Sequence, residues 1–289
     1  MVGYIFLFAY FLGGGNGGMH LAWSDNGLQW NELVNGSSVI TPDKGLMRDP
    51  FLFWSEKEQQ YHLIWTTEWK SDTIGHATSK DLLNWGEQEK IPVMANISGV
   101  RNCWAPEMMY DDETDTYIIF WASTVSGLFE ETAGTSEDKY NHRMWYTETK
   151  DFRSFTPAKL FYDPGFSIID STIVHLDDTY YLITKDERLV PEKKYLFVST
   201  GSSPRGPWSE PGPAISDSWV EGPTTITKDQ HTLVFFDRYL IKKYGAMRTS
   251  DFINWTDISE QIAMPEGARH GNIIRVKREQ IEALLQPTR

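Results

Sequence analysis

The sequence contains five imperfect repeats, and they limit the possible folds more than any other feature. Four segments share one shape, in which a polar turn ends on an aromatic residue, and a weaker fifth resembles them. They are SDNGLQW (24–30), SKDLLNW (79–85), TKDFRSF (149–155), TSDFINW (249–255) and the weaker SSPRGPW (202–208). Each follows a short apolar segment, as a tight turn between two outer strands of a sheet would.

Two further series of segments precede these turns. Short β-branched and aromatic runs begin at 4, 61, 117, 180 and 231, and we expect them to be middle strands. An earlier series is expected to form inner strands: RDPFLFWSE at 48, WAPEMMYDD at 104, IDSTIVHLDD at 169, EGPTTITKD at 221 and RHGNIIRVK at 269. Each repeat therefore predicts an inner, a middle and a third strand, then a turn and an outer strand. REQIEALL near the end predicts a short helical turn.

A period of roughly 50–65 residues with four short strands per unit is typical of a β-propeller blade. The sequence therefore predicts an all-β fold, a single five-bladed β-propeller catalytic domain over residues 1–289, rather than two β-sandwich domains. The last blade is expected to be split, with RHGNIIRV joining YIFLFAYF and MHLAWS from the N-terminal region.

The same split explains the apolar start, which we expect to be a buried strand followed by a glycine loop. This run is about half as long as a segment that spans a bilayer. It also has no basic region before it and no small-residue cleavage site, so we do not expect a signal peptide in this chain.

Composition narrows the class of ligand. The formal net charge is −13 and the pI about 5.0, which argues against a nucleic acid or an anionic membrane as partner. Aromatic residues make up 14% of the chain, with 12 Trp, as in sheets that bury aromatic rings or sites that stack on sugars. The single cysteine, Cys103, excludes an intramolecular disulfide and is expected to be a packing residue. These features fit a soluble enzyme that handles a neutral ligand.

Ionisable residues open the expected inner strands: Asp49, Glu107, Asp170, Glu221 and His270. Because the inner strands of a propeller line one channel, these groups are expected to converge at one mouth of it. Each has a structural explanation when taken singly, as a turn former, a strand cap or a satisfied core histidine. Their shared place in five repeats favours a functional role. Paired carboxylates without a nucleophilic Ser or Cys motif point to glycoside hydrolysis.

The chain resembles glycoside hydrolase family 43 over essentially its full length. The resemblance rests on RDP (48–50), WAPE (104–107), IDST (169–172), EGP (221–223) and RHG (269–271), which occur in the order of the family. It implies a five-bladed propeller that hydrolyses arabinosides or xylosides with inversion. It also implies Asp49 as general base, Glu221 as general acid, and Asp170 as the residue that orients the acid and raises its pKa. Inversion implies that base and acid lie about 6.5–9.5 Å apart.

The resemblance implies further site residues. Trp104 would stack on the sugar, Glu107 would line the same subsite, and Arg238 would contact a hydroxyl group. His270 would lie near the channel axis, where the family often holds a water cluster or a structural calcium ion, and no cofactor is required for the reaction.

Two departures from the family pattern bear on which sugar the site prefers. Glu107 stands where aspartate is common, and FLFW (51–54) follows the aspartate motif where smaller polar residues are frequent. The invertase-like relatives also use RDP, but after an NDPN sequence and with a later EC. This chain has no NDPN and carries EGP, so that branch is rejected.

The expected activity is that of an exo-acting, inverting α-L-arabinofuranosidase acting on plant polysaccharide side chains or oligosaccharides. β-Xylosidase and β-galactofuranosidase are the alternatives within the fold, and a non-catalytic carbohydrate-binding propeller is the alternative outside enzymes. The polar insertion at 126–144 either forms a rim at the site or is a solvated loop. The substrate class favours an extracellular or periplasmic location.

Overall fold

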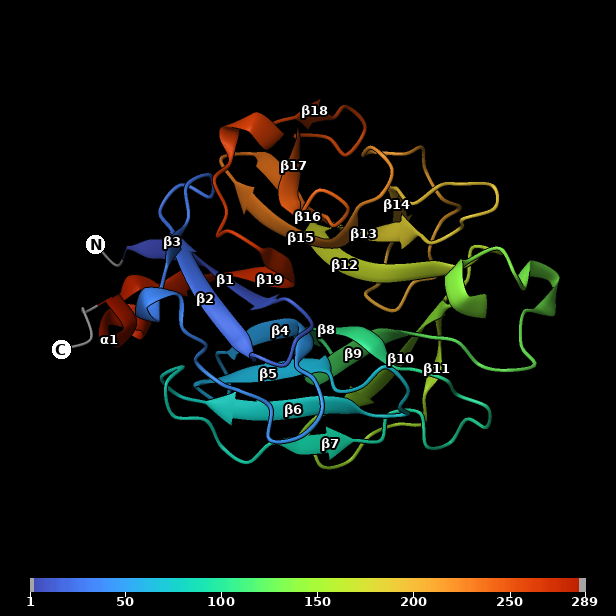
Figure 1. Ribbon diagram of the computed structural model, residues 1–289, viewed down its shortest axis with the longest axis horizontal. Coiled ribbons are helices and arrows are strands. Elements are labelled where there is room, and N and C mark those ends of the chain that lie inside the picture. Colours follow the sequence, from blue (N-terminus) through green and yellow to red (C-terminus); the bar gives the residue numbers. More distant parts are fainter. Residues whose placement is uncertain (1–2, 286–289) are drawn as a thin grey trace. The chain divides into compact units, whose positions relative to one another are not determined.

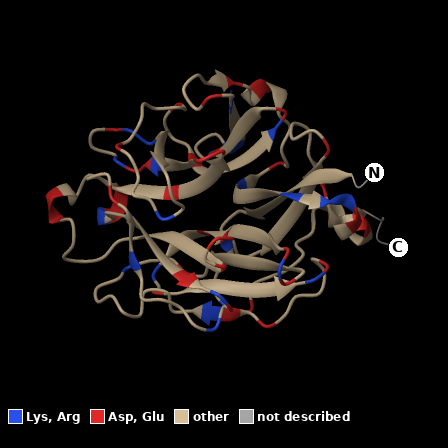
Figure 2. Ribbon diagram, turned by 180° about the vertical axis from the view of Figure 1, so that it is seen from behind, with Lys and Arg blue, Asp and Glu red and all other residues tan. Residues whose placement is uncertain are grey.

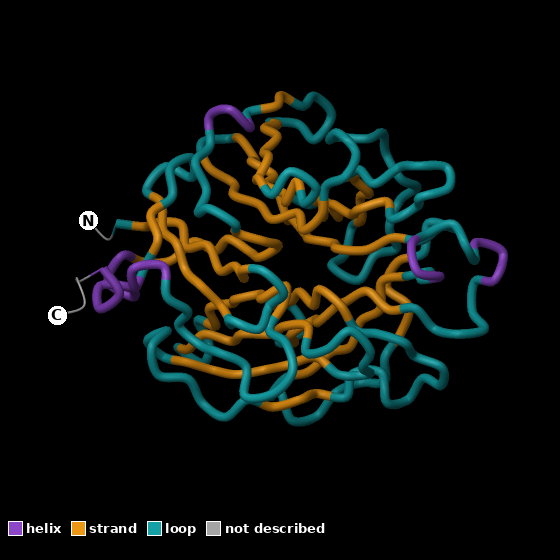
Figure 3. Tube along the Cα trace, in the orientation of Figure 1, coloured by secondary structure: helices purple, strands orange, loops and turns teal. Residues whose placement is uncertain are grey.

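The computed structural model describes residues 3–285, and most of them lie in β-strands and the turns between them (Figure 3). The fold is mostly β, a five-bladed β-propeller with one sheet for each repeat, as predicted (Figure 1). The helical segments of the described residues are short: η1 (Val34–Gly36), η2 (Glu130–Thr132), η3 (Glu137–Lys139), η4 (Ser259–Gln261), η5 (Arg278–Ile281) and α1 (Glu282–Leu285). The last two confirm the helical turn predicted for REQIEALL. No helix in the described part of the chain is long and apolar enough to cross a membrane.

All five sheets have an inner, a middle and a third strand in the predicted order, and four of them also have the predicted outer strand. The inner strands are β4 (Arg48–Ser55), β8 (Trp104–Asp111), β12 (Ile168–Leu176), β15 (Glu221–Lys228) and β19 (Ala268–Lys277). The middle strands are β5 (Gln60–Thr66), β9 (Thr116–Ser123), β13 (Thr179–Asp186), β16 (His231–Arg238) and β1 (Tyr4–Leu12). The third strands are β6 (Ile74–Ser79), β10 (Arg143–Thr149), β14 (Leu196–Gly201), β17 (Lys243–Thr249) and β2 (Met19–Ser24). The outer strands are β7 (Glu89–Ile91), β11 (Lys159–Tyr162), β18 (Thr256–Asp257) and β3 (Asn31–Glu32).

One sheet is assembled from both ends of the sequence, in the order β19-β1-β2-β3. β1 and β19 pair antiparallel, from Tyr4 opposite Lys277 to Leu12 opposite Ala268. Figure 1 shows the blue β1 beside the red β19. The predicted split blade is confirmed, and the apolar start of the chain is a buried strand followed by a turn.

The sheet of the third repeat departs from the prediction of four strands. Among residues 3–285 it has three, in the order β12-β13-β14. The chain then follows the edge of β14 with scattered hydrogen bonds, from Gly212 N to Val198 O (2.9 Å) and from Ile215 N to Leu196 O (2.8 Å). This segment includes PWSEPGP (207–213), whose prolines have no N–H to donate. A regular fourth strand therefore does not form.

The repeated turns are held by one set of side-chain hydrogen bonds. In the turn after β17, Phe252 N donates to Thr249 Oγ1 (2.9 Å), and Asn254 N donates to Asp251 Oδ1 (2.7 Å). The same two bonds recur in the turns that follow Ser24, Ser79 and Thr149. Short hydroxyl and Asx side chains stabilise turns in this way, which explains the repeated sequence pattern.

The chain forms two compact units. The first takes in the described residues of Met1–Thr67, Gly75–Lys90 and Thr224–Arg289, and the second takes in Glu68–Ile74 and Ile91–Pro223. The sheets that contain β1, β5 and β16 lie in the first unit, and those that contain β9 and β13 lie in the second. β15 begins in the second unit and continues in the first.

Each unit has an apolar core of its own. In the first unit, one cluster surrounds Leu52 and Leu63 and another surrounds Phe8 and Phe235. In the second unit, buried apolar side chains gather around Phe120. Charged residues lie mainly in loops and near strand ends (Figure 2). The middle of each strand therefore contributes apolar side chains to a core, and the strand ends carry polar groups.

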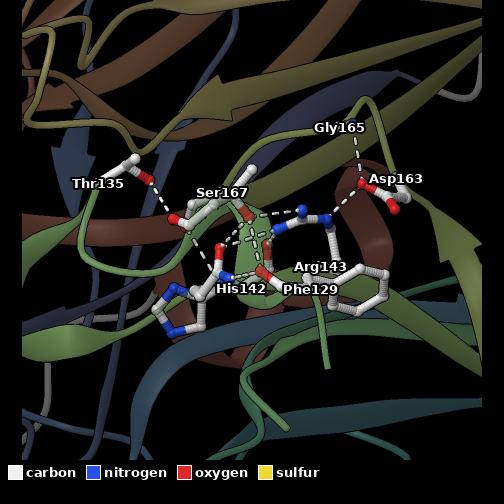
Figure 4. A network of polar contacts seen from close by, with 9 residues as sticks. Phe129, Thr135, His142, Arg143, Asp163, Gly165 and Ser167 are labelled. Carbon is white, nitrogen blue, oxygen red and sulfur yellow. Dashed lines mark hydrogen bonds and ion pairs between the residues drawn. The ribbon is translucent and has the colours of Figure 1, made fainter. Parts of the chain in front are cut away.

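The polar insertion that precedes β10 is only partly a solvated loop. Its last residues are buried, and β10 begins within it at Arg143. The Arg143 guanidinium forms an ion pair with Asp163, donates from Nη1 to His142 O (3.0 Å) and lies 4.3 Å from the centre of the Phe129 ring (Figure 4). These partners stabilise the buried charge of Arg143. The solvated part of the insertion is therefore shorter than its sequence suggests. Its role as a rim stays a prediction.

Candidate active site

Backbone irregularities mark the beginnings of the inner strands. The pairing register shifts between Arg48 and Phe51, between Trp104 and Glu107, between Ile169 and Ser171, and on β1 between Ala9 and Phe11. Such β-bulges re-aim side chains and are common beside active sites. Left-handed backbone accompanies them, with φ of 50° at Asp49, 48° at Ala105, 51° at Asp170 and 59° at Gly222. Three of these four residues precede a proline, and these prolines were the sequence signal for an irregular backbone.

The ionisable residues do not occupy one shared position relative to these bulges, contrary to the sequence-based expectation. Asp49 and Asp170 are themselves the left-handed residues. Glu221 precedes the left-handed Gly222 by one residue, and Glu107 follows the left-handed Ala105 by two. The two aspartates thus share a backbone conformation, whereas the two glutamates approach the strand ends from different positions.

In the first unit, neighbouring strands contact both oxygens of the Asp49 carboxylate. Thr66 Oγ1 on β5 donates to Asp49 Oδ2 (2.8 Å). His270 Nδ1 on β19 lies 3.5 Å from Asp49 Oδ1. Glycine is required after His270, because a Cβ on Gly271 would lie 1.9 Å from Ala9 O. His270 thus lies beside Asp49, whereas the convergence of all five ionisable groups stays a prediction, and Thr66 was not anticipated.

Two arginines next to these residues flank an aromatic ring. The guanidinium carbons of Arg48 and Arg269 lie 4.7 Å and 5.9 Å from the centre of the Phe11 ring. Arg269 Nε also donates to the buried Asp237 Oδ2 (2.6 Å). The arginines of RDP and RHG thus anchor the strands that present Asp49. Sequence reasoning quoted these arginines only as parts of motifs.

Arg238, the predicted hydroxyl contact, lies at the end of β16. Its Nη2 donates to Asp257 on the outer strand β18 (3.1 Å). It also lines a cavity of about 710 Å³, together with Tyr244 and Glu266 among others. These contacts direct Arg238 toward the outer part of its sheet, and its role toward a sugar stays a prediction.

In the second unit, Asp170 and Glu221 are linked through the backbone. Asp170 Oδ2 accepts a hydrogen bond from Gly222 N (3.0 Å), the residue directly after Glu221. The Asp170 residue is 5% exposed, whereas the Glu221 side chain is 20% exposed. Lys185 Nζ on β13 lies 3.4 Å from Glu221 Oε2. One carboxylate is thus fixed and buried, while the other reaches solvent beside an ammonium group.

Glu107 belongs to the same unit and is buried. Burial raises the pKa of the Glu107 carboxyl well above its usual value; the charge of Asp170 adds to this, and a hydrogen bond with Thr172 opposes it. A carboxyl kept neutral in this way can donate a hydrogen bond to a ligand or a neighbouring carboxylate. This property suits the predicted subsite role of Glu107.

Trp104 lies in a cluster of aromatic rings. Its ring centre is 5.8 Å from that of Trp69, 4.7 Å from that of Tyr140 and 5.2 Å from that of His142. Trp69 is 53% exposed, and the Arg101 guanidinium lies 4.1 Å from the Tyr140 ring centre. Exposed indole rings next to polar groups are suited to sugars. Sequence reasoning found Trp104 but missed the rest of this cluster, which comes from three separate segments.

His142 is buried in this cluster with both ring nitrogens lacking a hydrogen-bond partner. Burial lowers the pKa of the His142 imidazole to about 3, although the charge of Glu187 acts in the opposite direction. The folded protein therefore holds the neutral imidazole, and an unfolded histidine would bind a proton near pH 6.5.

We expect His142 to destabilise the fold as pH falls through the range between its unfolded and folded pKa values. Below about pH 6.5 the unfolded state binds a proton that the folded state rejects, down to about pH 3. This group alone therefore lowers the free energy of unfolding by about 1.4 kcal/mol per pH unit within that window. His142→Gln should reduce the slope of the free energy of unfolding against pH by this amount. Urea titrations at pH 4.5, 5.5 and 6.5 measure that slope. An unchanged slope would contradict the assignment.

Other expected features concern cysteine and metal chemistry. Cys103 is buried, and burial raises the pKa of its thiol to about 12, which fits a packing role.

Within residues 3–285, no group of three or more His, Cys, Asp or Glu side chains is arranged to hold a metal ion. Calcium prefers oxygen ligands, whereas the imidazole of His270 offers nitrogen. A calcium ion near His270 stays a prediction.

Comparison with known proteins places this arrangement in context. A family model described as a probable glycosyl hydrolase domain, related to glycoside hydrolase family 43, matches residues 1–282. An α-L-arabinofuranosidase of Bifidobacterium longum subsp. longum is 27% identical over 231 residues, which are 66% of this chain and 22% of that protein. The chain thus spans about a fifth of the length of this curated relative.

Solved structures share the fold at low sequence identity. An α-L-arabinofuranosidase from Lactobacillus brevis superposes with a TM-score of 0.57 at 16% identity, covering 74% of this chain and 72% of that one. A thermostable family-43 glycoside hydrolase gives a TM-score of 0.59 at 15% identity, covering 80% of each chain. An exo-β-1,3-galactanase from Phanerochaete chrysosporium gives 0.56 at 11% identity, covering 78% of this chain and 51% of that one. These likenesses concern the fold alone.

Proposed function

The chain belongs to the family of probable glycosyl hydrolase domains related to glycoside hydrolase family 43, and we propose that it is an exo-acting, inverting α-L-arabinofuranosidase. Its substrates are terminal arabinofuranosyl residues on plant polysaccharide side chains or oligosaccharides. The choice of sugar is supported by the B. longum relative, which is named an α-L-arabinofuranosidase. The net charge of −13 favours a neutral sugar over an anionic one.

The observation that carries the proposal is the hydrogen bond between Gly222 N and Asp170 Oδ2, at 3.0 Å. It holds a buried carboxylate against the backbone next to Glu221. A general acid needs a fixed position and a nearby group that controls its ionisation. Glu221 therefore supplies the proton, and Asp170 orients it.

The reaction is a single displacement at the anomeric carbon. Asp49 takes a proton from a water molecule as the water oxygen bonds to that carbon. The bond from the carbon to the leaving oxygen breaks, and Glu221 gives its proton to that oxygen. Thr66 and His270 orient the Asp49 carboxylate, each at one oxygen. The steps are proton transfers between carboxyl groups and water, so the proposal assigns them no cofactor.

The sugar is recognised by stacking and by hydrogen bonds. Trp104 provides a ring face, and its neighbours Trp69 and Tyr140 extend the aromatic surface. Glu107, whose burial favours the protonated form, can donate a hydrogen bond to a sugar hydroxyl. Such contacts give specificity for a neutral ring with several hydroxyl groups.

The proposal is tested by hydrolysis of 4-nitrophenyl α-L-arabinofuranoside, β-D-xylopyranoside and β-D-galactofuranoside. We expect the highest kcat/KM on the arabinofuranoside, and proton NMR should show that the first anomer formed has the inverted, β configuration. Faster turnover of another glycoside would replace the sugar assignment. A first-formed anomer with retained configuration would exclude the mechanism, and sugar binding without any turnover would favour a carbohydrate-binding protein.

A further inference from the structure

A chain of buried ion pairs reaches Glu221, and no role above accounts for it. Lys185 Nζ lies 2.8 Å from Glu187 Oε2 and 3.4 Å from Glu221 Oε2. Glu187 Oε1 lies 2.7 Å from Lys194 Nζ. Lys185 and Lys194 are almost completely buried, and Glu187 is nearly so. Burying lysine is costly even when it is paired, so two buried lysines in a chain of ion pairs that reaches a proposed catalytic residue require an explanation.

In this chain of ion pairs, two ammonium groups flank one buried carboxylate. Lys185 and Lys194 carry two positive charges, and Glu187 carries one negative charge between them. Although burial opposes its ionisation, the two lysines hold the pKa of Glu187 below its usual value. Glu137 lies 3.7 Å from Lys194, but its side chain is half exposed. Lys185 therefore places one ammonium group beside both the Glu187 and the Glu221 carboxylates.

Further ionisable groups of this unit interact with these ion pairs or with the residue after Glu221. Asp170 on β12 accepts a hydrogen bond from Gly222 N, the residue after Glu221. Glu107 on β8 interacts with Asp170, and burial favours its neutral form. His142, which precedes β10 and is influenced by the charges of Glu187 and Lys185, is also neutral because burial lowers its pKa. The Glu221 carboxyl thus lies beside the Lys185 ammonium group, and the Asp170 carboxylate accepts from the backbone N–H of the next residue.

We propose that Lys185 is a positioning residue for the general acid: its ammonium group holds the Glu221 carboxyl in place, and Glu187 pairs with the same ammonium group. The inference rests on the proposed function, because it requires Glu221 to be the acid. In general, removing a positive charge beside a carboxyl favours its protonated form, and removing a negative charge favours its ionised form. Glu187 reduces the effect of Lys185 by pairing with it.

This arrangement predicts opposite effects of two substitutions on the pH profile of kcat/KM. Lys185→Met removes the positive charge, so the alkaline fall in activity should move to higher pH by about one unit. Glu187→Gln removes the compensating negative charge, so the alkaline fall should move to lower pH. The double variant should return close to the wild-type profile, and Lys185→Arg should retain it. The substrate is the phenyl glycoside of the sugar that the wild type hydrolyses, since phenol leaves slowly enough to need the acid.

The outcomes separate this inference from the function on which it rests. A wild type that hydrolyses no glycoside contradicts the proposed function itself. Where the wild type is active, shifts in the same direction, or no shift in Lys185→Met, overturn the role of Lys185. A purely structural role would lower stability and kcat without moving the profile. Circular dichroism checks folding, and if Glu187→Gln does not fold, the comparison of Lys185→Met with Lys185→Arg decides.

Discussion

Replacing Glu221 with glutamine is expected to lower kcat by about 10²–10⁴-fold on glycosides whose leaving group needs a proton. Glutamine keeps the shape of the side chain but cannot supply that proton. The loss should be much smaller for 2,4-dinitrophenyl glycosides, because this leaving group departs as an anion. The measurement is a series of kcat values for aryl glycosides plotted against the acidity of the released phenol. A steeper dependence in Glu221→Gln than in the wild type is the expected result.

Glu192→Gln is the matched control, because Glu192 is exposed and lies in the same unit. The Glu192→Gln variant should show the same kcat values as the wild type across the aryl glycosides. An equal loss on all leaving groups in Glu221→Gln would remove Glu221 from the acid role, since a missing proton matters least where none is needed.

Replacing Asp49 with asparagine is expected to lower kcat by about 10²–10⁴-fold on every substrate, whatever its leaving group. Asparagine can still accept the hydrogen bond from Thr66, so the strand ends should keep their structure, but it cannot take a proton from water. Steady-state kinetics and thermal unfolding of the variant measure the two effects separately. Near-normal activity in a folded variant would exclude Asp49 as the base.

Asp178→Asn, at an exposed aspartate, controls for the general loss of one charge. Asp49→Gly offers a second check, because glycine accepts the positive φ at this position. Azide added to Asp49→Gly should restore turnover and yield a glycosyl azide with inverted configuration, since azide needs no base. An azide product with retained configuration would contradict the assigned geometry of attack.

The strands could be predicted from the sequence because their signals are local. Apolar alternation, turn residues and the hydroxyl–Asx pattern recur within each repeat, and even the split sheet follows from their order. The missing fourth strand after β14 was also encoded, in the prolines of residues 207–213, but the repeat pattern outweighed that signal. The assignment of the whole chain as one catalytic domain stays a prediction.

The candidate site could be predicted only in part. Asp49, Asp170 and Glu221 stood out as charges beside apolar strands, and their roles in a common site stay a prediction, although His270 lies beside Asp49. Lys185 did not stand out, because it ends a middle strand where a solvated lysine would be ordinary. Its contact with Glu221 joins residues from two different sheets, and no local pattern reports such a contact.

The pairing of β1 with β19 has a consequence for how the protein is made. β1 is synthesised before the other strands of residues 3–285, whereas its partner β19 is synthesised after them. Until then, YIFLFAYFL presents an unsatisfied strand edge and a row of apolar and aromatic side chains to other nascent chains. Its productive partner closes a loop of nearly the whole chain, which slows folding. Until β19 is made, the apolar edge of β1 therefore offers a binding site that a chaperone can cover.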